Sequence, residues 1–337
     1  MSLKKFILTR LFLTPFMVLI LLTLVFFILR ILPGDPVRVA VGPKLPPEYV
    51  KKICHELGLD KPIMVQYFDY LWSLLHGDFG KSLITRRSFA NELIDRFKAS
   101  VELAIASIIV AIPLGLFIGD VSAKYEGSPL AHLARLFTVA TYSIPVFWLG
   151  IIFQVVFGIW LGILPITGGP PPMVKYSVRA ITGFTTLDCL LNGDFIGFAE
   201  CIRHLILPAV TLGVVISGII GKVSRNALVE VMHLDYVTAA KARGLPEKII
   251  HDKYIFRNAL IPIITIIGLQ LALLLGGAIL TETTFDYPGL GTYLKDAVLS
   301  RDYTVVQAAV TLYAIMVAVI SFIVDIIYAF LDPRIRY

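Results

Sequence analysis

The chain alternates between long apolar stretches and shorter polar ones. Runs of about 18 or more apolar residues have the length of a membrane-spanning helix, because roughly 20 residues rising about 1.5 Å each cross the hydrocarbon of a bilayer. The pattern therefore predicts an all-α membrane protein with six transmembrane helices. The predicted spans are Leu11–Leu32, Val101–Val121, Leu136–Leu164, Leu205–Gly221, Leu260–Leu280 and Val305–Phe330.

The composition favours a membrane over water as the main solvent. Of the 337 residues 57% are hydrophobic and only 16% are charged, and the mean hydropathy is +0.81. Such a chain has too few charges to solvate a soluble enzyme of this size. The first span follows Lys4, Lys5 and Arg10 as a signal peptide would, but its apolar core is too long and no small-residue cleavage site follows. A retained anchor is expected.

The spans divide the chain into three predicted parts. Residues 1–32 form a cytoplasmic N-terminus and the first span, and residues 33–99 form an external loop. That loop is too long for a mere connector, and its periodicity predicts amphipathic helices over Pro46–Leu57 and Tyr67–Leu75. The third part, residues 100–337, is a five-helix core with a cytoplasmic loop at 222–260 and external loops at 165–204 and 281–304.

Lys and Arg are unevenly distributed between alternate short loops. They gather in the first ten residues, after the second span, in the segment 222–257 and at the C-terminus. Because cytoplasmic loops carry the excess of basic residues, the sequence predicts a multi-pass protein of the cell membrane with both termini in the cytoplasm. The net charge of +6 then reflects topology, and no nucleic-acid partner is expected.

Small residues recur at every fourth position in three of the spans. In a membrane such positions mark faces where helix backbones approach closely. The pattern predicts a compact bundle, although helices that slide in a transport cycle need the same smooth faces. The residues are Ser107, Ala111, Gly115, Gly119 and Ala123; Gly213, Ser217 and Gly221; and Gly268, Ala272 and Gly276.

Few polar side chains fall at membrane depth. Glu102, Asp120 and Asp325 lie near predicted span ends, where headgroups or water reach them, and they form no obvious pair. Amide and hydroxyl groups are better candidates for lining a polar passage, with hydrogen bonding between helices as the equal alternative. The candidate pathway residues are Gln154, Thr265 and Gln270.

The sequence contains no recognisable catalytic, metal or nucleotide motif. Cys54, Cys189 and Cys201 all fall in predicted external loops, and whether Cys189 and Cys201 pair stays open. There is no C-x-x-C, no H-x-x-x-H and no G-x-x-x-x-G-K-[ST]. No cofactor or metal is expected on this chain, and if ATP drives it, ATP and Mg belong to partner subunits.

One polar segment, residues 235–263, interrupts the apolar chain between the fourth and fifth spans. Asp235 is a candidate N-cap, residues 236–243 suit about two helical turns, and Gly244 before Leu-Pro ends the helix. Small residues at Ala239, Ala240 and Gly244, with Tyr236 and Val237 beside them, suggest a surface that docks into a groove. An ordinary solvated loop helix is at least as good a reading of this pattern alone.

Ala239 and Ala240, followed after three residues by Gly244, resemble the cytoplasmic E-A-A-x3-G loop of permease subunits in binding-protein-dependent ABC importers, in the dipeptide and oligopeptide branch. In that family the loop forms a coupling helix held in a cleft of the ATPase. Thr238 replaces the glutamate, so that residue's contacts do not carry over, and Gly244 stands eighteen residues before Pro262, a longer interval than the general pattern. The coupling residues expected here are Asp235, Tyr236, Ala239, Ala240, Arg243 and Gly244.

Further strings resemble landmarks of that branch in its order and extend over almost the whole chain. Each alone is a turn-like pattern found in many proteins. They are LPGDP at 32–36, LGLDKP at 57–62, GDFGKS at 77–82, TETTFDYPGLG at 281–291, RDY at 301–303 and LDPRIR at 331–336.

The resemblance implies a type I ABC importer permease bundle that forms half of a translocation pathway. Its expected partners are a homologous second permease subunit, two ATPase subunits, an extracellular solute-binding protein and membrane lipid. Peptides are the first implied substrate, with oligosaccharides or nickel as alternatives. An ion-coupled secondary transporter would need paired ionisable groups at midplane, and a membrane enzyme would need a nucleophile or metal ligands; neither pattern is present.

Overall fold

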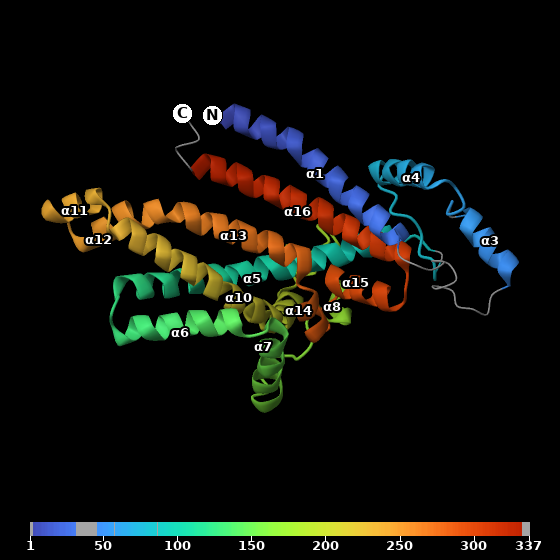
Figure 1. Ribbon diagram of the computed structural model, residues 1–337. Helices are drawn as coiled ribbons and strands as arrows, with labels where there is room; N and C mark the ends of the chain where they lie inside the picture. Colours follow the sequence, from blue (N-terminus) through green and yellow to red (C-terminus); the bar gives the residue numbers. More distant parts are fainter. Residues whose placement is uncertain (1–2, 32–45, 57, 86, 332–337) are drawn as a thin grey trace.

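The structure, a computed structural model, describes residues 3–31, 46–56, 58–85 and 87–331. It is a bundle of long helices with shorter helices at both ends (Figure 1). Within these residues the only strand-like pairing is an isolated bridge between Lys81 and Ser88. The all-α prediction is confirmed. The strings LPGDP and LDPRIR lie outside the described residues, except for Leu331.

Five helices are long and apolar enough to cross a membrane, and they match the first, second, fourth, fifth and sixth predicted spans. The helix α1 packs along α16, and α5 packs along α10 (Figure 1). These helices are α1 (Leu3–Ile31), α5 (Ala90–Lys124), α10 (Phe195–Met232), α13 (Arg257–Gly277) and α16 (Tyr303–Leu331).

The third predicted span is wrong as a continuous helix. This region instead forms three helical segments, α6 (Pro129–Ser143), α7 (Val146–Phe153) and the π-helix η1 (Gln154–Trp160). The axis bends by 105° between α6 and the pair formed by α7 and η1. Pro145 follows the break, and a proline disfavours helical geometry in the residue before it. The second half therefore turns away from the bundle axis (Figure 1).

The fourth span is also much longer than predicted. Its helix α10 has 38 residues and continues past Gly221 to Met232, so the first part of the predicted 222–260 loop is helical. Hydropathy identifies only the part of a helix that contacts lipid. The helix itself can extend beyond that part into water, because its backbone hydrogen bonds are formed there too. Pro262, near the start of the predicted fifth span, lies inside α13.

Small residues bring α5 and α10 into close contact, as the four-residue spacing predicts. A Cβ on Gly119 would lie 2.5 Å from the Cβ of Ser224, and a Cβ on Gly115 would lie 2.7 Å from that of Ile220. Real Cβ atoms do not approach so closely, so glycine is required at both positions. The spacing therefore specifies the packing of these two helices.

Each end of the bundle has its own set of short helices. The amphipathic helices predicted in residues 33–99 are present, although α4 begins four residues earlier than expected. One end carries α3 (Pro47–Glu56), α4 (Ile63–Leu75), α8 (Pro172–Ser177), α9 (Thr185–Leu191), α14 (Ile279–Thr284) and α15 (Leu290–Leu299). The other carries α11 (Asp235–Ala242), α12 (Glu247–Ile249) and the π-helix η2 (Ile250–Phe256).

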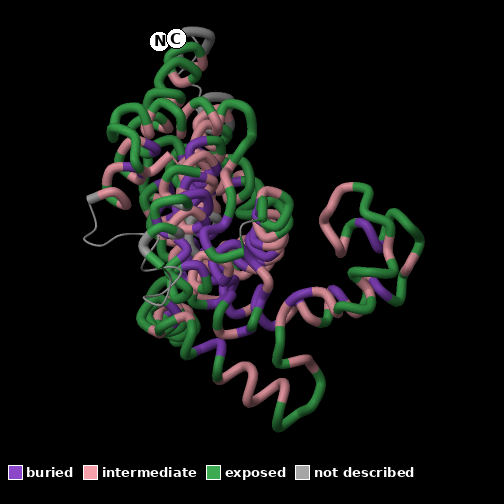
Figure 2. Tube along the Cα trace, turned by 90° about the vertical axis from the view of Figure 1, so that its right-hand side faces the viewer, coloured by how far each residue is buried: buried purple, intermediate pink, exposed green. Residues whose placement is uncertain are grey.

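We call the end with α11 the inner end and the opposite end the outer end, following the predicted topology. The helix α1 begins and α16 ends at the inner end (Figure 1). Buried positions concentrate along the middle of the bundle (Figure 2). They form a large central cluster that includes Leu103, Ile220 and Leu290, and a separate inner cluster that includes Leu228, Val237 and Ile263.

Two cysteines meet at the outer end. Cys189 in α9 and Cys201 in α10 are both buried, and their thiols are hydrogen-bonded to each other. Burial raises the pKa of the Cys189 thiol, which the hydrogen bond from Cys201 opposes. Among the described residues no disulfide is formed.

Candidate functional site

The helix α11 forms the tip of the inner end. Its N-cap is Leu234 in extended geometry, and Asp235 is the first helical residue without a capping side-chain hydrogen bond. The predicted N-cap was therefore misplaced by one residue, although an acidic group in the first turn still favours the helix dipole. Gly244 has φ +71, a left-handed conformation that ends helices and favours glycine, as predicted.

The helix α11 has one buried and one exposed face. Val237 is 0% exposed and Ala240 is 3% exposed, so neither offers the outward docking surface that the sequence suggested for them. Their spacing of three residues places both on one face. The exposed side carries the other predicted coupling residues, namely Asp235, Tyr236, Ala239, Arg243 and Gly244.

The buried face of α11 packs into the inner cluster, which joins five elements, one of them α13 through Ile263. Val237 and Ala240 share this cluster with Ala123 of α5, Leu228 of α10 and Ile255 of η2. Small and aliphatic side chains make contacts without fixed direction. A force on α11 therefore reaches three long helices through one continuous apolar contact.

A polar contact ties the same region to α5. His251 Nε2 in η2 lies 2.7 Å from Asp120 Oδ1, and His251 Nδ1 lies 3.0 Å from Asp252 Oδ1. This pair could not be predicted from the sequence, because its partners are 131 residues apart. Asp325, also unpaired in the sequence analysis, lies 3.2 Å from Arg10. The expectation that these ionisable groups form no pair was wrong.

The three predicted pathway residues occupy different surroundings. Gln154 Nε2 donates to the carbonyls of Ile166 at 2.8 Å and Thr284 at 2.9 Å, so it fixes η1 to its neighbours. The hydroxyl of Thr265 donates to Ile261 in its own helix. Gln270 lines a cleft, a mainly apolar space of about 180 Å³ between α7, α10, α13 and α14.

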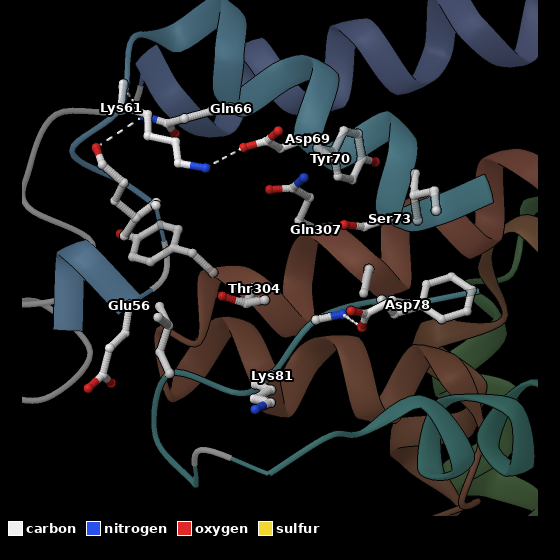
Figure 3. A pocket seen from close by; sticks show the side chains of 18 of the residues that line it. Glu56, Lys61, Gln66, Asp69, Tyr70, Ser73, Asp78, Lys81, Thr304 and Gln307 are labelled. Carbon is white, nitrogen blue, oxygen red and sulfur yellow. Dashed lines mark hydrogen bonds and ion pairs between the residues drawn. The ribbon is translucent and has the colours of Figure 1, made fainter. Parts of the chain in front are cut away.

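A polar pocket of about 330 Å³ opens at the outer end between α4 and α16. Figure 3 shows Asp69, Tyr70 and Ser73 of α4 on one side and Thr304 and Gln307 of α16 on the other. Lys61 donates to Asp69 at 2.7 Å, and the tyrosine hydroxyl lies 2.5 Å from that of Thr311. The other charged groups in its lining are Arg30, Glu56, Asp78 and Lys81.

Glu282, inside the string TETTFDYPGLG, holds the outer end together. Its carboxyl accepts a hydrogen bond from Ser100 at 2.6 Å and from the backbone amides of Gly291 at 2.7 Å and Thr292 at 3.0 Å. Burial raises the pKa of Glu282, which these hydrogen bonds oppose. The string is a landmark in the sequence, but it did not predict that this carboxyl is buried, because its partner Ser100 lies 182 residues away.

These regions offer binding surfaces and mechanical connections between helices. Within the described residues no three His, Cys, Asp or Glu side chains gather to hold a metal ion. The geometry therefore assigns the exposed face of α11, the cleft beside Gln270 and the outer pocket as the candidate sites.

Two family models match the chain. The model described as the binding-protein-dependent transport system inner membrane component covers residues 111–337. The model of the N-terminal region of such membrane components covers residues 3–104. Together they account for nearly the whole chain.

Similar proteins extend over nearly the same length. A di/tripeptide transport system permease protein of Pseudomonas aeruginosa is 41% identical over 315 residues, 93% of each chain. A dipeptide transport system permease protein of Escherichia coli is 38% identical over 337 residues, 99% of each chain. A glutathione transport system permease protein of Salmonella typhimurium is 35% identical over 319 residues, 95% of this chain and 94% of that one.

Proposed function

The chain belongs to the family of binding-protein-dependent transport system inner membrane components, and from this membership we propose that it is the permease subunit of an ATP-driven importer of dipeptides and other short peptides. Its similar proteins are named for di- and tripeptides, dipeptides and glutathione. These names favour short peptides over the alternative cargoes, oligosaccharides and nickel.

The two-faced helix α11 is the observation that carries the proposed mechanism. One face is buried against the ends of α5, α10 and η2, and the other is exposed at the tip of the inner end. A separate ATPase subunit that grips the exposed face would move the buried face and its helices together. The chain has no phosphate-binding loop, so ATP and Mg would be bound by two such subunits.

The exposed coupling residues would contact the ATPase directly. Tyr236 is 40% exposed, and its hydroxyl donates to the carbonyl of Tyr254 at 3.3 Å, which holds the ring beside η2. Ala239 leaves room for a partner to approach the helix backbone. Ala240 has a different role, because it fixes α11 to the bundle rather than to a partner.

A second, homologous permease subunit would complete the pathway. The cleft beside Gln270 lies between α7, α10, α13 and α14, and Thr281 in its lining has a buried hydroxyl without a hydrogen-bond partner. Opening this cleft alternately to each side of the membrane would admit and release the peptide. Gln154 would act by positioning η1, and the exposed Thr265 stays a candidate lining residue.

The outer pocket and the helices α3 and α4 would receive the solute-binding protein. The pocket carries charges of both signs, which suits a polar loop of another protein better than an apolar ligand. Its position at the opposite end from α11 (Figure 1) separates peptide delivery from the ATPase contact. This requires the inner end to face the cytoplasm, as the distribution of basic residues predicts.

The coupling proposal is tested with Ala239→Trp in the assembled importer, reconstituted in proteoliposomes. We expect ATPase subunits to bind more weakly, or ATP to be hydrolysed without peptide uptake, while the thermal stability of the permease is unchanged. Ala199→Trp is the control, because Ala199 is an equally exposed helical alanine at the outer end. A variant that assembles and transports like the parent would contradict the role of α11.

The docking proposal is tested with Lys81→Glu, which reverses a charge in the outer pocket. We expect weaker binding of the solute-binding protein, measured by titration of the reconstituted importer, and unchanged ATPase assembly. Lys124→Glu makes the same charge change at the inner end and serves as the control. Equal binding by both variants would remove the outer pocket from the docking surface.

A further inference from the structure

A cleft of about 510 Å³ lies in the inner half of the bundle, between α6 and α10 and beside the end of α5. It is separate from the coupling face of α11 and from the cleft beside Gln270. Its polar lining comes from Ser122, Arg135, Lys222 and Arg225, and its apolar lining includes Val139 and Ile219.

The cleft has an excess of positive charge. Arg225 Nη2 lies 2.8 Å from Glu126 Oε1, so this cation is balanced. The guanidinium of Arg135 and the ammonium of Lys222 form no ion pair within the described part of the chain. Lys222 Nζ instead lies 5.9 Å from the ring centroid of Tyr142, another lining residue. Two cations in one cleft therefore lack an acidic partner.

The position of the cleft favours an anion beside these two cations. Lys222 is exposed and directly follows Gly221, where the predicted fourth span ends, so the cleft lies at the inner interface of the membrane. A cation among apolar groups within a membrane is rare and is usually paired with an anion or directed to the interface. An anion from outside the chain would supply the missing partner.

Two polar atoms in the cleft also lack partners. Ser122 is 2% exposed, and its hydroxyl oxygen has no hydrogen-bond partner. Arg225 Nε is buried and likewise unpartnered. Buried polar groups are rarely left without a hydrogen-bond partner. The Ser122 hydroxyl and Arg225 Nε can both donate hydrogen bonds, and the oxygens of a phosphate can accept them.

The surface beside the cleft is apolar and exposed. Leu133, Leu136 and Val139 of α6 are each more than 60% exposed, and they continue from the cleft along the side of the bundle. We propose that this cleft binds an anionic phospholipid of the inner leaflet. Its phosphate would lie between Arg135 and Lys222, and its acyl chains would run along α6. Basic pockets between helices on the cytoplasmic side recognise such headgroups.

A phospholipid suits this combination better than the carboxylate of a passing peptide. A peptide needs a polar passage on all sides, whereas here cations lie directly beside an apolar helix flank. The inference goes beyond the import function and adds a lipid requirement to it. It depends on the inner end lying in the cytoplasmic leaflet.

The test measures lipid binding to the purified importer by native mass spectrometry, with phosphatidylglycerol and phosphatidylcholine as probes. We expect Lys222→Gln to weaken phosphatidylglycerol binding about fivefold, since a juxtamembrane cation contributes about that much to binding an anionic lipid surface. Phosphatidylcholine binding should not change. Lys222→Arg keeps the charge and should retain binding, which separates a charge effect from misfolding.

Lys124→Gln is the matched control, because Lys124 is the last residue of α5, at the inner end of the bundle, but does not line the cleft. If Lys222→Gln and Lys124→Gln weaken phosphatidylglycerol binding equally, the effect is general surface charge and the proposal is wrong. It is also wrong if a photo-crosslinker placed at Val139 in the membrane reacts with a protein subunit and not with lipid, or if a dipeptide displaces the bound lipid.

Discussion

The two ends of the bundle are held together by different kinds of contact. At the outer end, buried carboxyls bind backbone amides: Glu282 accepts from Gly291 and Thr292, and Asp302 accepts from Leu83 at 3.2 Å and from the hydroxyl of Ser82. At the inner end, α11 rests on aliphatic side chains, with the partly exposed Asp120–His251 pair beside them.

This difference indicates which end moves. Hydrogen bonds to a buried carboxyl require fixed distances and angles, so the outer end is expected to stay rigid. Aliphatic contacts have no preferred direction, and a helix such as α11 keeps most of its buried area when it shifts slightly. In the proposed importer the outer end would be a fixed platform and the inner end would respond to the ATPase.

The largest effect is expected at the outer end, from Glu282→Ala. The substitution leaves two buried amides and the Ser100 hydroxyl without an acceptor, which costs about 3 kcal/mol or more in the free energy of unfolding. The measurement is the thermal unfolding of the purified protein. Glu48→Ala, at an exposed acidic residue of α3, should change it little. Similar stability of the two variants would show that the carboxyl does not hold this end.

A smaller loss is expected at the inner end from Ala240→Leu. The larger side chain overfills the inner cluster, at a cost of about 2 kcal/mol. Ala239→Leu adds the same atoms on the exposed face of α11 and should leave thermal unfolding of the isolated subunit unchanged. If the two variants were equally stable, the packed face of α11 would have been assigned wrongly.

A still smaller loss of stability is expected from a substitution at Gly244. Gly244→Ala introduces a side chain at φ +71, which costs about 1 kcal/mol. Gly244→Asn should cost less, because asparagine tolerates this conformation. No atom lies within 4 Å of the added Cβ. A far greater loss of peptide transport than of stability in Gly244→Trp would therefore indicate a contact with the ATPase.

The smallest change in stability is expected from His251→Ala. Partly exposed ion pairs contribute about 0.5 kcal/mol, and the His251 and Asp120 side chains are 25% and 33% exposed. Backbone amides of η2 should nevertheless exchange hydrogen faster, because the tie to α5 is lost. Asp252→Ala keeps that tie and should exchange like the parent. Unchanged exchange in His251→Ala would mean that the inner cluster alone positions η2.

The sequence predicted five of the spans because hydrophobic length is a property of contiguous residues. It did not predict the bend before Pro145. Hydropathy averaged over a window does not respond to a single residue, and a proline alone does not show whether a helix breaks. Pro113, Pro208 and Pro262 all lie inside unbroken helices. What distinguishes Pro145 is its surroundings, where Gly150 packs against Phe285 and holds α7 in its turned position.

The candidate site was predictable in its local part only. Gly244 and the polar residues around α11 predicted this helix and placed its ends within one residue of those in the structure. The spacing of Val237 and Ala240 suits a buried face, and the prediction of an outward surface at these two residues is wrong. The Asp120–His251 pair and the hydrogen bond from Ser100 to Glu282 join segments far apart in the chain, and no local pattern reveals them.

The π-helix η2 makes the residue count between α11 and α13 important. A π-helical turn contains roughly one residue more than an α-helical turn, and each residue advances an α-helix by about 100°. Deleting a single residue from Ile250–Phe256 would let this stretch become regular α-helix. The tip would then keep nearly the same rotational phase relative to α13, because the turn loses only its extra residue, whereas a deletion within the α-helical part of α13 would turn the tip by about 100°. Insertions and deletions in this stretch should therefore be judged by helical phase rather than by length.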